Sequence, residues 1–329
     1  MECPKCGKEN TITAKFCLAC GTKLPVGATS KSQASFGKQP IIGKPIKVLL
    51  LIVGSLLALL VIVALISEKH TQEAAIYYQR GTAYYEKGNI DEAISNFNKA
   101  IEINPNFADA YGFRGVILRG KGNFDQAILD INKAIEINSN SPPQLYYNRG
   151  IAHREKGNFE QAILDFNKTI EKDPGFADAY VSRGFVYYKE KDLERAISDL
   201  GRALEINPKD AKVYVSRGVF YTEKGNFDQA ISDCNKSIKI NSKYAPAYYN
   251  RGIAYRERGN LDKAISDFNK AIEIDSTFAN AYYQLGKVYF MKKNYAKSWD
   301  NIHKAEELGC KIIGPEFLID LKNSSGRER

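Results

Sequence analysis

The feature that most constrains the fold is a repeat of 34 residues that begins near Ala74 and runs almost to the C-terminus. Glycines mark the repeat, and the successive gaps between them are 34, 35, 34, 34, 34 and 34 residues, with one extra residue at Pro142-Pro143. The marker glycines are Gly81, Gly115, Gly150, Gly184, Gly218, Gly252 and Gly286. A period of this length predicts small units that bury their apolar faces only against their neighbours.

The first unit, 74–107, predicts two helices joined by a tight turn. In its first half, aromatic residues such as Tyr77 and Tyr84 recur at helical spacing. Gly88 then provides a residue that accepts positive φ just past a helix end, and the asparagine after it is suited to cap the next helix. The second half, EAISNFNKAIEI, has apolar residues on one face and ends before Pro105. The chain is therefore predicted to stack seven helical hairpins.

Each unit also repeats a tyrosine four residues before its glycine, and small residues 12 and 19 residues after it. The tyrosines are Tyr77, Tyr111, Tyr146, Tyr180, Tyr214, Tyr248 and Tyr282. This pattern resembles the tetratricopeptide repeat family over residues 74–313. The resemblance implies an all-α fold, a right-handed superhelix in which the first helices of the hairpins line a concave surface. The segment 314–329 is expected to be a capping helix that begins at Pro315, followed by a disordered tail.

The chain departs from the family at the place before each marker glycine, which is usually leucine. Six units have arginine there, and only the last has Leu285. A partly buried guanidinium needs a partner, and the second helices repeat an aspartate at one fixed place. We predict an Arg–Asp ladder that joins the stack, and the alternative is solvated surface charge. Its members are Arg114, Arg149, Arg183, Arg217 and Arg251 with Asp130, Asp165, Asp199, Asp233 and Asp267.

By the same resemblance, the places that face the family's groove form three rows. The predicted partner-binding residues are Tyr78, Tyr147, Tyr249 and Tyr283; Gln79, Asn148, Asn250 and Gln284; and Tyr85, Arg119, Arg154, Tyr188, Arg256 and Phe290. Tyrosine and arginine often dominate binding energy, and amide side chains can hold a peptide backbone. The groove is therefore expected to bind a protein or peptide. The alternative for any one tyrosine is packing against the next unit. The sequence does not indicate an oligomeric state.

Residues 48–66 form a stretch of 19 residues without a charge. As a helix it is about 28 Å long, close to the roughly 30 Å hydrocarbon core of a bilayer. A cleavable signal peptide, the alternative, would have a shorter apolar run and a small-x-small cleavage site. We therefore predict a retained transmembrane helix in contact with lipid.

The flanks of this helix predict its orientation. The segment 22–47, read as a basic flexible linker, contains five lysines and no acid. The positive-inside rule then places the N-terminus in the cytoplasm. The chain is expected to cross the cytoplasmic (inner) membrane once, with the repeats in the periplasm or outside the cell. The alternative topology has the repeats in the cytoplasm.

Two CxxCG motifs lie close to the N-terminus, and their cysteines are Cys3, Cys6, Cys17 and Cys20. Four thiolates at this spacing predict a closed structural Zn²⁺ site, with no open position for catalysis. A segment of 21 residues cannot build an apolar core, so zinc would supply the folding energy of residues 1–21. This segment resembles the short zinc ribbon at the N-terminus of many prokaryotic membrane proteins. The alternative is two disulfides in an oxidising space.

The remaining composition points away from chemistry. The net charge is +9, but more than half of it lies in residues 1–73, which argues against a nucleic-acid surface on the repeats. There are three histidines, and no catalytic triad or phosphate loop is present. His153 occupies a tyrosine place and is predicted to be a packing substitution. We therefore expect no enzyme, but a membrane-anchored interaction scaffold. The alternative is a regulator whose zinc ribbon senses metal or contacts nucleic acid, with the repeats as input domain.

Overall fold

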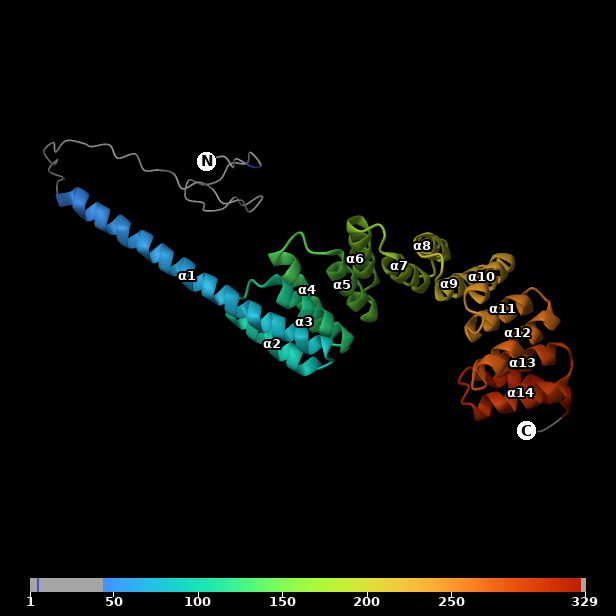
Figure 1. Cartoon of the computed structure of the whole chain (residues 1–329). Helices are drawn as coiled ribbons and strands as arrows, with labels where there is room; N and C mark the ends of the chain where they lie inside the picture. The colour runs from blue at the N-terminus through green and yellow to red at the C-terminus, as the bar shows by residue number, and fades with distance from the viewer. Residues whose placement is uncertain (1–4, 6–43, 327–329) are drawn as a thin grey trace. The chain divides into compact units, whose positions relative to one another are not determined.

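The computed structural model describes Lys5 and residues 44–326, and from residue 44 on they are helices joined by short connections. No strand occurs among these residues, so the all-α fold predicted from the sequence is confirmed. The chain divides into two compact units between Leu65 and Ile66. Within the second unit, helices follow one another as hairpins in chain order (Figure 1).

The hairpins pair each odd-numbered helix with the next even-numbered one, and α15 follows the seventh hairpin. The helices are α1 (Lys44–Glu86), α2 (Ile90–Ile103), α3 (Ala108–Gly120), α4 (Phe124–Ile137), α5 (Pro143–Glu155), α6 (Phe159–Lys172), α7 (Ala177–Lys189), α8 (Leu193–Ile206), α9 (Ala211–Glu223), α10 (Phe227–Ile240), α11 (Ala245–Glu257), α12 (Leu261–Ile274), α13 (Ala279–Met291), α14 (Tyr295–Glu307) and α15 (Pro315–Ser325).

α1 is a single helix of 43 residues, whereas the sequence suggested one helix over 48–66 and a second that begins at residue 74. The intervening residues, SEKHTQE, contain neither proline nor glycine. Nothing there stops a helix, so the apolar segment and the first repeat helix share one run of backbone hydrogen bonds.

The interior of six of the seven hairpins is built from a glycine on the first helix and a large apolar side chain on the second, and in the fifth hairpin Gly218 faces Cys234. A Cβ added to Gly150 of α5 would lie 2.8 Å from the ring of Phe166 on α6. At Gly184 of α7, an added Cβ would lie 2.5 Å from Leu200 on α8. Phe166 and Leu200 are fully buried. The repeated glycine therefore lies where the two helices approach most closely, and any side chain there would overfill the core.

The turn inside each hairpin requires a residue with a left-handed backbone. Glycine occupies five of the seven turns, at Gly88, Gly122, Gly157, Gly225 and Gly259. Lys191 and Lys293, with φ of 64° and 58°, occupy the other two. The next residue was expected to cap the second helix, and the side chains of Asp192, Asn260 and Asn294 do so. The N-cap asparagines of α2, α4, α6 and α10 make no such bond.

The last hairpin is covered by α15. Leu321 is fully buried in a cluster with Trp299 of α14 and Tyr283 of α13. The indole Nε1 of Trp299 donates to Ser325 Oγ at 3.0 Å. The apolar face that an eighth hairpin would cover is therefore covered by one short helix.

Candidate binding groove

Five arginines on first helices each donate two hydrogen bonds to a carboxylate on the second helix of the same hairpin. Arg114 Nε and Nη2 lie 2.6 and 2.7 Å from the two carboxylate oxygens of Asp130, and the aspartate side chain is only 4% exposed. Paired bonds of this kind fix geometry as well as charge. The other pairs, with distances of 2.6–2.9 Å, are Arg149–Asp165, Arg183–Asp199, Arg217–Asp233 and Arg251–Asp267.

Four of these arginines also reach the preceding hairpin. Arg114 Nη1 donates to Asn98 Oδ1 on α2 at 2.6 Å. The equivalent contacts join Arg149 to Asn132, Arg183 to Asn167 and Arg251 to Asn235. Arg217 lacks this contact because Gly201 stands at the asparagine place. Each complete rung therefore links three helices from two consecutive hairpins.

The tyrosine row lies between consecutive hairpins. The ring of Tyr147 has its centroid 5.0 Å from Phe176, in the loop before α7, and 5.9 Å from Phe166 on α6. Its hydroxyl lies 3.4 Å from Ser182 Oγ on α7. Equivalent ring pairs are Tyr78–Phe107 and Tyr249–Phe278, and in the last hairpin Tyr283 instead packs edge-on against Phe317 of α15. Burial raises the pKa of the Tyr249 hydroxyl. These rings thus occupy space between hairpins and leave little of their surface to a partner.

The row of amide side chains is mostly turned inward. Asn148 and Asn250 each donate to the backbone carbonyl four residues earlier, at 2.6 and 2.8 Å. Gln284 is buried and accepts a hydrogen bond from Arg256. Gln79 is exposed. Only Gln79 therefore has an amide that is open to solvent and free of such a bond.

The arginines of the third row differ in their partners. Arg154 and Arg256 each form an ion pair with the glutamate that directly follows them, at 2.6 Å for Arg154. Arg119 is followed by Gly120. Among the described residues no acid pairs with Arg119, and its Nε is buried without a hydrogen-bond partner.

The aromatic members of the third row also differ. Tyr85 is 42% exposed. Tyr188 stacks on Phe220 at 4.4 Å and donates to Glu223, and this hydrogen bond raises its pKa to about 12. Phe290 packs edge-on against Phe317. Tyr85 is thus the most accessible aromatic ring of this row.

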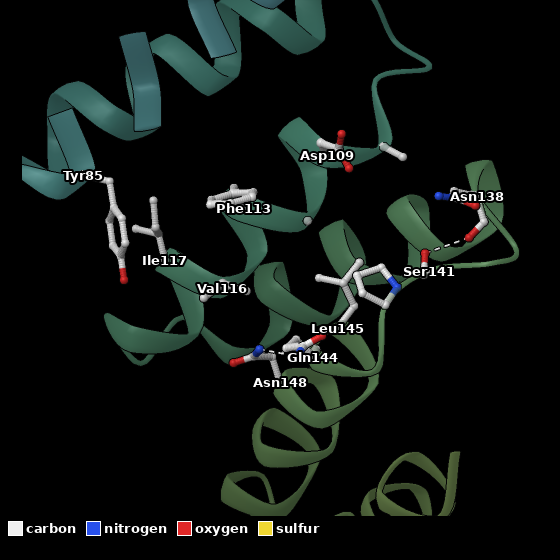
Figure 2. Close-up of a pocket in the computed structure, with 13 residues that line it drawn as sticks. Tyr85, Asp109, Phe113, Val116, Ile117, Asn138, Ser141, Gln144, Leu145 and Asn148 are labelled. Atoms are coloured by element: carbon white, nitrogen blue, oxygen red, sulfur yellow. Dashed lines mark hydrogen bonds between the residues drawn. The ribbon is translucent and has the colours of Figure 1, made fainter. Parts of the chain in front are cut away.

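An apolar pocket of about 330 Å³ opens between the first helices α3 and α5, with Tyr85 of α1 at one side (Figure 2). We call it the α3–α5 pocket. Its lining residues are Tyr85, Ala108, Asp109, Gly112, Phe113, Val116, Ile117, Asn138, Ser141, Pro142, Gln144, Leu145 and Asn148. Phe113 and Leu145 approach it from opposite helices, and Phe113 is 41% exposed. Of these residues, Tyr85 and Asn148 were among those predicted to bind a partner, and the others were not.

The α3–α5 pocket exists because two large rings are missing. Gly112 stands at a place that holds tyrosine in four other units, such as Tyr147, and Pro142 stands where Phe176 lies in the next unit. Leu145 fills part of the space, since its methyl groups would lie 3.2 and 3.3 Å from a Cβ added at Gly112. The sequence did contain the signal. The glycine at the tyrosine place and the single 35-residue gap both fall at this junction.

Two further groups lie in the core of the repeats. Cys234 is buried at a phenylalanine place, and burial raises the pKa of its thiol to about 12. His153 lies at a tyrosine place with Nδ1 buried and unbonded, and desolvation lowers its pKa. Both positions are those of packing side chains in the other units.

The four cysteines predicted to bind zinc, Cys3, Cys6, Cys17 and Cys20, lie outside the described residues. Among the residues that the structure describes, no group of histidine, cysteine or acidic side chains could hold a metal ion. α1 is the one helix of the described chain that is long and apolar enough to cross a membrane.

Comparison with family models agrees with this architecture. Tetratricopeptide repeat models match residues 74–107, 108–141, 143–176, 177–210, 211–244 and 234–266, and a TPR repeat model matches 254–293. Together they cover about two thirds of the chain. A zinc-ribbon domain model matches residues 3–24.

Solved structures share the fold at low sequence identity. A tetratricopeptide repeat protein from Parabacteroides merdae is 21% identical, covers 78% of this chain and 100% of its own, and has a TM-score of 0.58. The C-terminal part of a TPR repeat-containing protein from Cytophaga hutchinsonii is 19% identical, covers 74% of this chain and 98% of its own, and has a TM-score of 0.62. At these identities the likeness shows the fold alone.

One curated relative is an uncharacterised protein of Methanocaldococcus jannaschii, 39% identical over 44 residues. The match covers 13% of this chain, and this chain spans about half of the relative's length.

Proposed function

We propose a function from one premise: this chain belongs to the tetratricopeptide repeat family and has a zinc-ribbon domain at its N-terminus. Its repeats support a role as a protein–protein interaction scaffold. More specifically, we propose that the repeats bind a peptide segment of a partner on the concave face formed by the first helices, and that α1 anchors this scaffold in a membrane.

The membrane anchor is supported by the surface of α1. Every residue from Leu49 to Ile66 is exposed, and this stretch contains most of the large exposed apolar side chains of the described chain. Exposure of this much apolar surface to water is unfavourable. In a bilayer the same side chains would contact lipid acyl chains instead of water. The lysines of 22–47 favour a topology with the N-terminus in the cytoplasm and the repeats on the other side.

The zinc ribbon is supported by its donor set. Cys3, Cys6, Cys17 and Cys20 supply four thiolates, which suit Zn²⁺ in a closed structural site. When bound, the metal would crosslink two CxxC turns and supply the folding energy of a segment too short for a core. Its removal would therefore unfold residues 1–21 and leave the repeats intact.

The observation that carries the binding function is the unequal use of the concave face. Most of its tyrosines are committed to packing between hairpins, as Tyr147 is against Phe176. Tyr85 and Phe113 instead keep about two fifths of their surface exposed, at the edge of the α3–α5 pocket. Accessible aromatic side chains on a rigid concave scaffold are typical of binding surfaces.

Photocrosslinking in intact membranes tests this function. A photoreactive amino acid at Tyr85 or Phe113 samples the concave face, and one at Leu164, which is 65% exposed on a second helix, samples the opposite face. We expect the same partner protein to be crosslinked from Tyr85 and Phe113 and not from Leu164. Equal crosslinking from all three positions, or from Leu164 alone, would contradict binding on the concave face.

The topology has its own test. Protease added to spheroplasts should digest residues 74–329 if the repeats lie outside the cytoplasmic membrane, and should leave them intact if they lie inside. A cytoplasmic marker protein controls for lysis.

A further inference from the structure

The second repeat unit departs from the others at three places that face the concave side. It has Gly112 where Tyr147 and its equivalents lie in other units, and Gly120 where Arg154 and Arg256 are followed by glutamate. The third departure is the extra residue at the end of the unit, next to Pro142. The first two changes remove a side chain that is present at the equivalent place of those units, and the third adds a residue beside the α3–α5 pocket.

The first consequence is the α3–α5 pocket itself. Its walls are mainly apolar, with Phe113, Val116 and Leu145 around the opening (Figure 2). A volume of about 330 Å³ is at the small end of ligand pockets, which suits one bulky side chain better than a whole cofactor. Two of the polar side chains in the lining already have partners, since Asn148 donates to the carbonyl of Gln144 and Ser141 Oγ donates to the carbonyl of Asn138.

The second consequence is the free charge of Arg119. It follows Val116 by three residues on α3, so the two side chains are neighbours on one helix face, with Cβ atoms about 5–6 Å apart. Among the described residues Arg119 has no acidic partner, and its Nε is buried without a hydrogen bond. A guanidinium in this state favours an incoming carboxylate. At the other end of α3, the exposed Asp109 repels one.

These two features define one kind of occupant. We propose that the α3–α5 pocket binds a bulky aromatic or branched aliphatic side chain of a peptide partner, and that Arg119 pairs with a carboxylate of the same peptide. Gly112 and Arg119 are seven residues apart, about 10 Å along the helix, so an extended peptide would carry its carboxylate roughly two or three residues from the apolar side chain. This inference rests on the proposed function and names the chemistry of the partner.

The test uses the full chain in lipid nanodiscs and a display library of random linear peptides as the probe. We expect the selected peptides to share a bulky apolar residue and, on one side of it, an aspartate, a glutamate or the terminal carboxylate. Replacement of the apolar residue by alanine should weaken binding by about tenfold to a hundredfold. Replacement of the acid by its amide should weaken it by roughly threefold to tenfold, with the difference lost at high salt.

Variants of the chain provide the matched controls. Gly112→Tyr introduces the tyrosine of four other units and fills the pocket, which requires the Leu145 methyl groups to shift. Val181→Tyr introduces the same side chain at the equivalent place of the fourth unit. We expect only Gly112→Tyr to reduce binding of the selected peptides, by at least about tenfold. Circular dichroism shows whether Gly112→Tyr folds. If it does not fold, Val116→Phe replaces it as the variant that fills the pocket, from another lining position.

The role of the Arg119 charge is tested by a second pair of variants. Arg119→Gln removes the free guanidinium, and Arg154→Gln removes one that already has a glutamate partner. Only Arg119→Gln should abolish the preference for an acidic peptide. Selected peptides that bind Gly112→Tyr and Arg119→Gln as tightly as the parent chain would overturn this inference and leave the groove function standing. If no peptide is enriched, or if the enriched peptides crosslink to Leu164 and not to Phe113, both proposals fail.

Discussion

The junction between the second and third hairpins and the junction between the third and fourth are built on the same backbone plan but differ in filling. At the third-to-fourth junction, Tyr147 and Phe176 place two rings 5.0 Å apart between the hairpins. At the second-to-third junction, Gly112 and Pro142 occupy these places and a pocket of about 330 Å³ remains. The aromatic pair thus fills the space between the hairpins at one junction, and its absence leaves the α3–α5 pocket at the other. A separate hollow of about 370 Å³ at the third-to-fourth junction lies at the C-terminal ends of α5 and α7, beside Arg154 and Phe185.

Both junctions are crossed by a rung of the Arg–Asp ladder. Arg149 joins Asp165 to Asn132 across the open junction, and Arg183 makes the equivalent bonds across the filled one. The open junction therefore depends more on this polar link, because it has fewer aromatic contacts to hold it.

The largest expected effect comes from emptying the core of a hairpin. Phe268 is fully buried on α12, and Phe268→Ala should cost about 3–5 kcal/mol of the free energy of unfolding. Leu145 lies half-buried beside the α3–α5 pocket, and Leu145→Ala should cost about 1 kcal/mol, because its side chain has less contact to lose. Urea titration followed by circular dichroism measures both losses. Similar losses would mean that the open junction is as tightly packed as a hairpin core.

The next effect separates the two junctions directly. Arg149→Met and Arg183→Met each leave a nearly buried aspartate without its partner, at a cost of about 2–4 kcal/mol. Because neighbouring contacts alone hold a repeat array together, we expect Arg149→Met to split urea unfolding into two steps. Arg183→Met should keep one step, since the rings of Tyr147 and Phe176 still join its hairpins. One step for both variants would show that the ladder does not matter more at the open junction.

A smaller effect is expected at a turn within the regular part of the array. Lys191 has a left-handed backbone with φ of 64°, where five other turns have glycine. Lys191→Gly relieves this strain and should raise the free energy of unfolding by roughly 0.5–1 kcal/mol. Gly157→Lys is the reverse change at an equivalent turn and should lower it by a similar amount. The two urea midpoints should move in opposite directions, and a shift in the same direction would contradict this account of the turn.

The smallest effect depends on pH and lies next to the open junction. Desolvation lowers the pKa of His153 below 6.5, while the nearby Asp165 opposes this shift and Arg149 and Lys156 add to it. The unfolded chain thus binds the proton more tightly, so stability is complete above pH 6.5 and falls as the pH drops through the lower pKa of the folded state. His153→Tyr, the residue of other units, should lose less stability between pH 7.5 and pH 5 than the parent chain. Thermal midpoints at the two pH values measure this, and equal losses would exclude the histidine as the cause.

Much of the fold could be read from the repeat alone. Seven glycines at one spacing, with tyrosine and small residues at set distances, predicted the hairpins because each place has a single physical requirement, such as the close approach of helices at Gly150. The recurring Arg and Asp also lie within hydrogen-bond distance in the structure, as at Arg114 and Asp130. The continuity of α1 was not foreseen, because the span and the first repeat were treated as separate elements.

The groove was the less predictable part. The family's groove places identified Tyr147 as a binding residue, but whether such a ring faces a partner or the next hairpin depends on what the neighbouring loop presents. Phe176 lies in that loop, and its ring packs against the ring of Tyr147. Conversely, Gly112 has no side chain that could bind a partner, so the sequence did not indicate it as a binding residue. Its contribution is the space that it leaves in the α3–α5 pocket.

The sequence by itself determined the architecture, since a strict period leaves each unit only its neighbours to pack against. The tertiary structure alone decided which groove residues are free. Exposure and pairing depend on residues about one repeat away in sequence. The ring of Tyr147, for example, is covered by the ring of Phe176, which lies in the loop before the next hairpin. The α3–α5 pocket likewise lies where Gly112 and Pro142 both lack the rings found at the next junction.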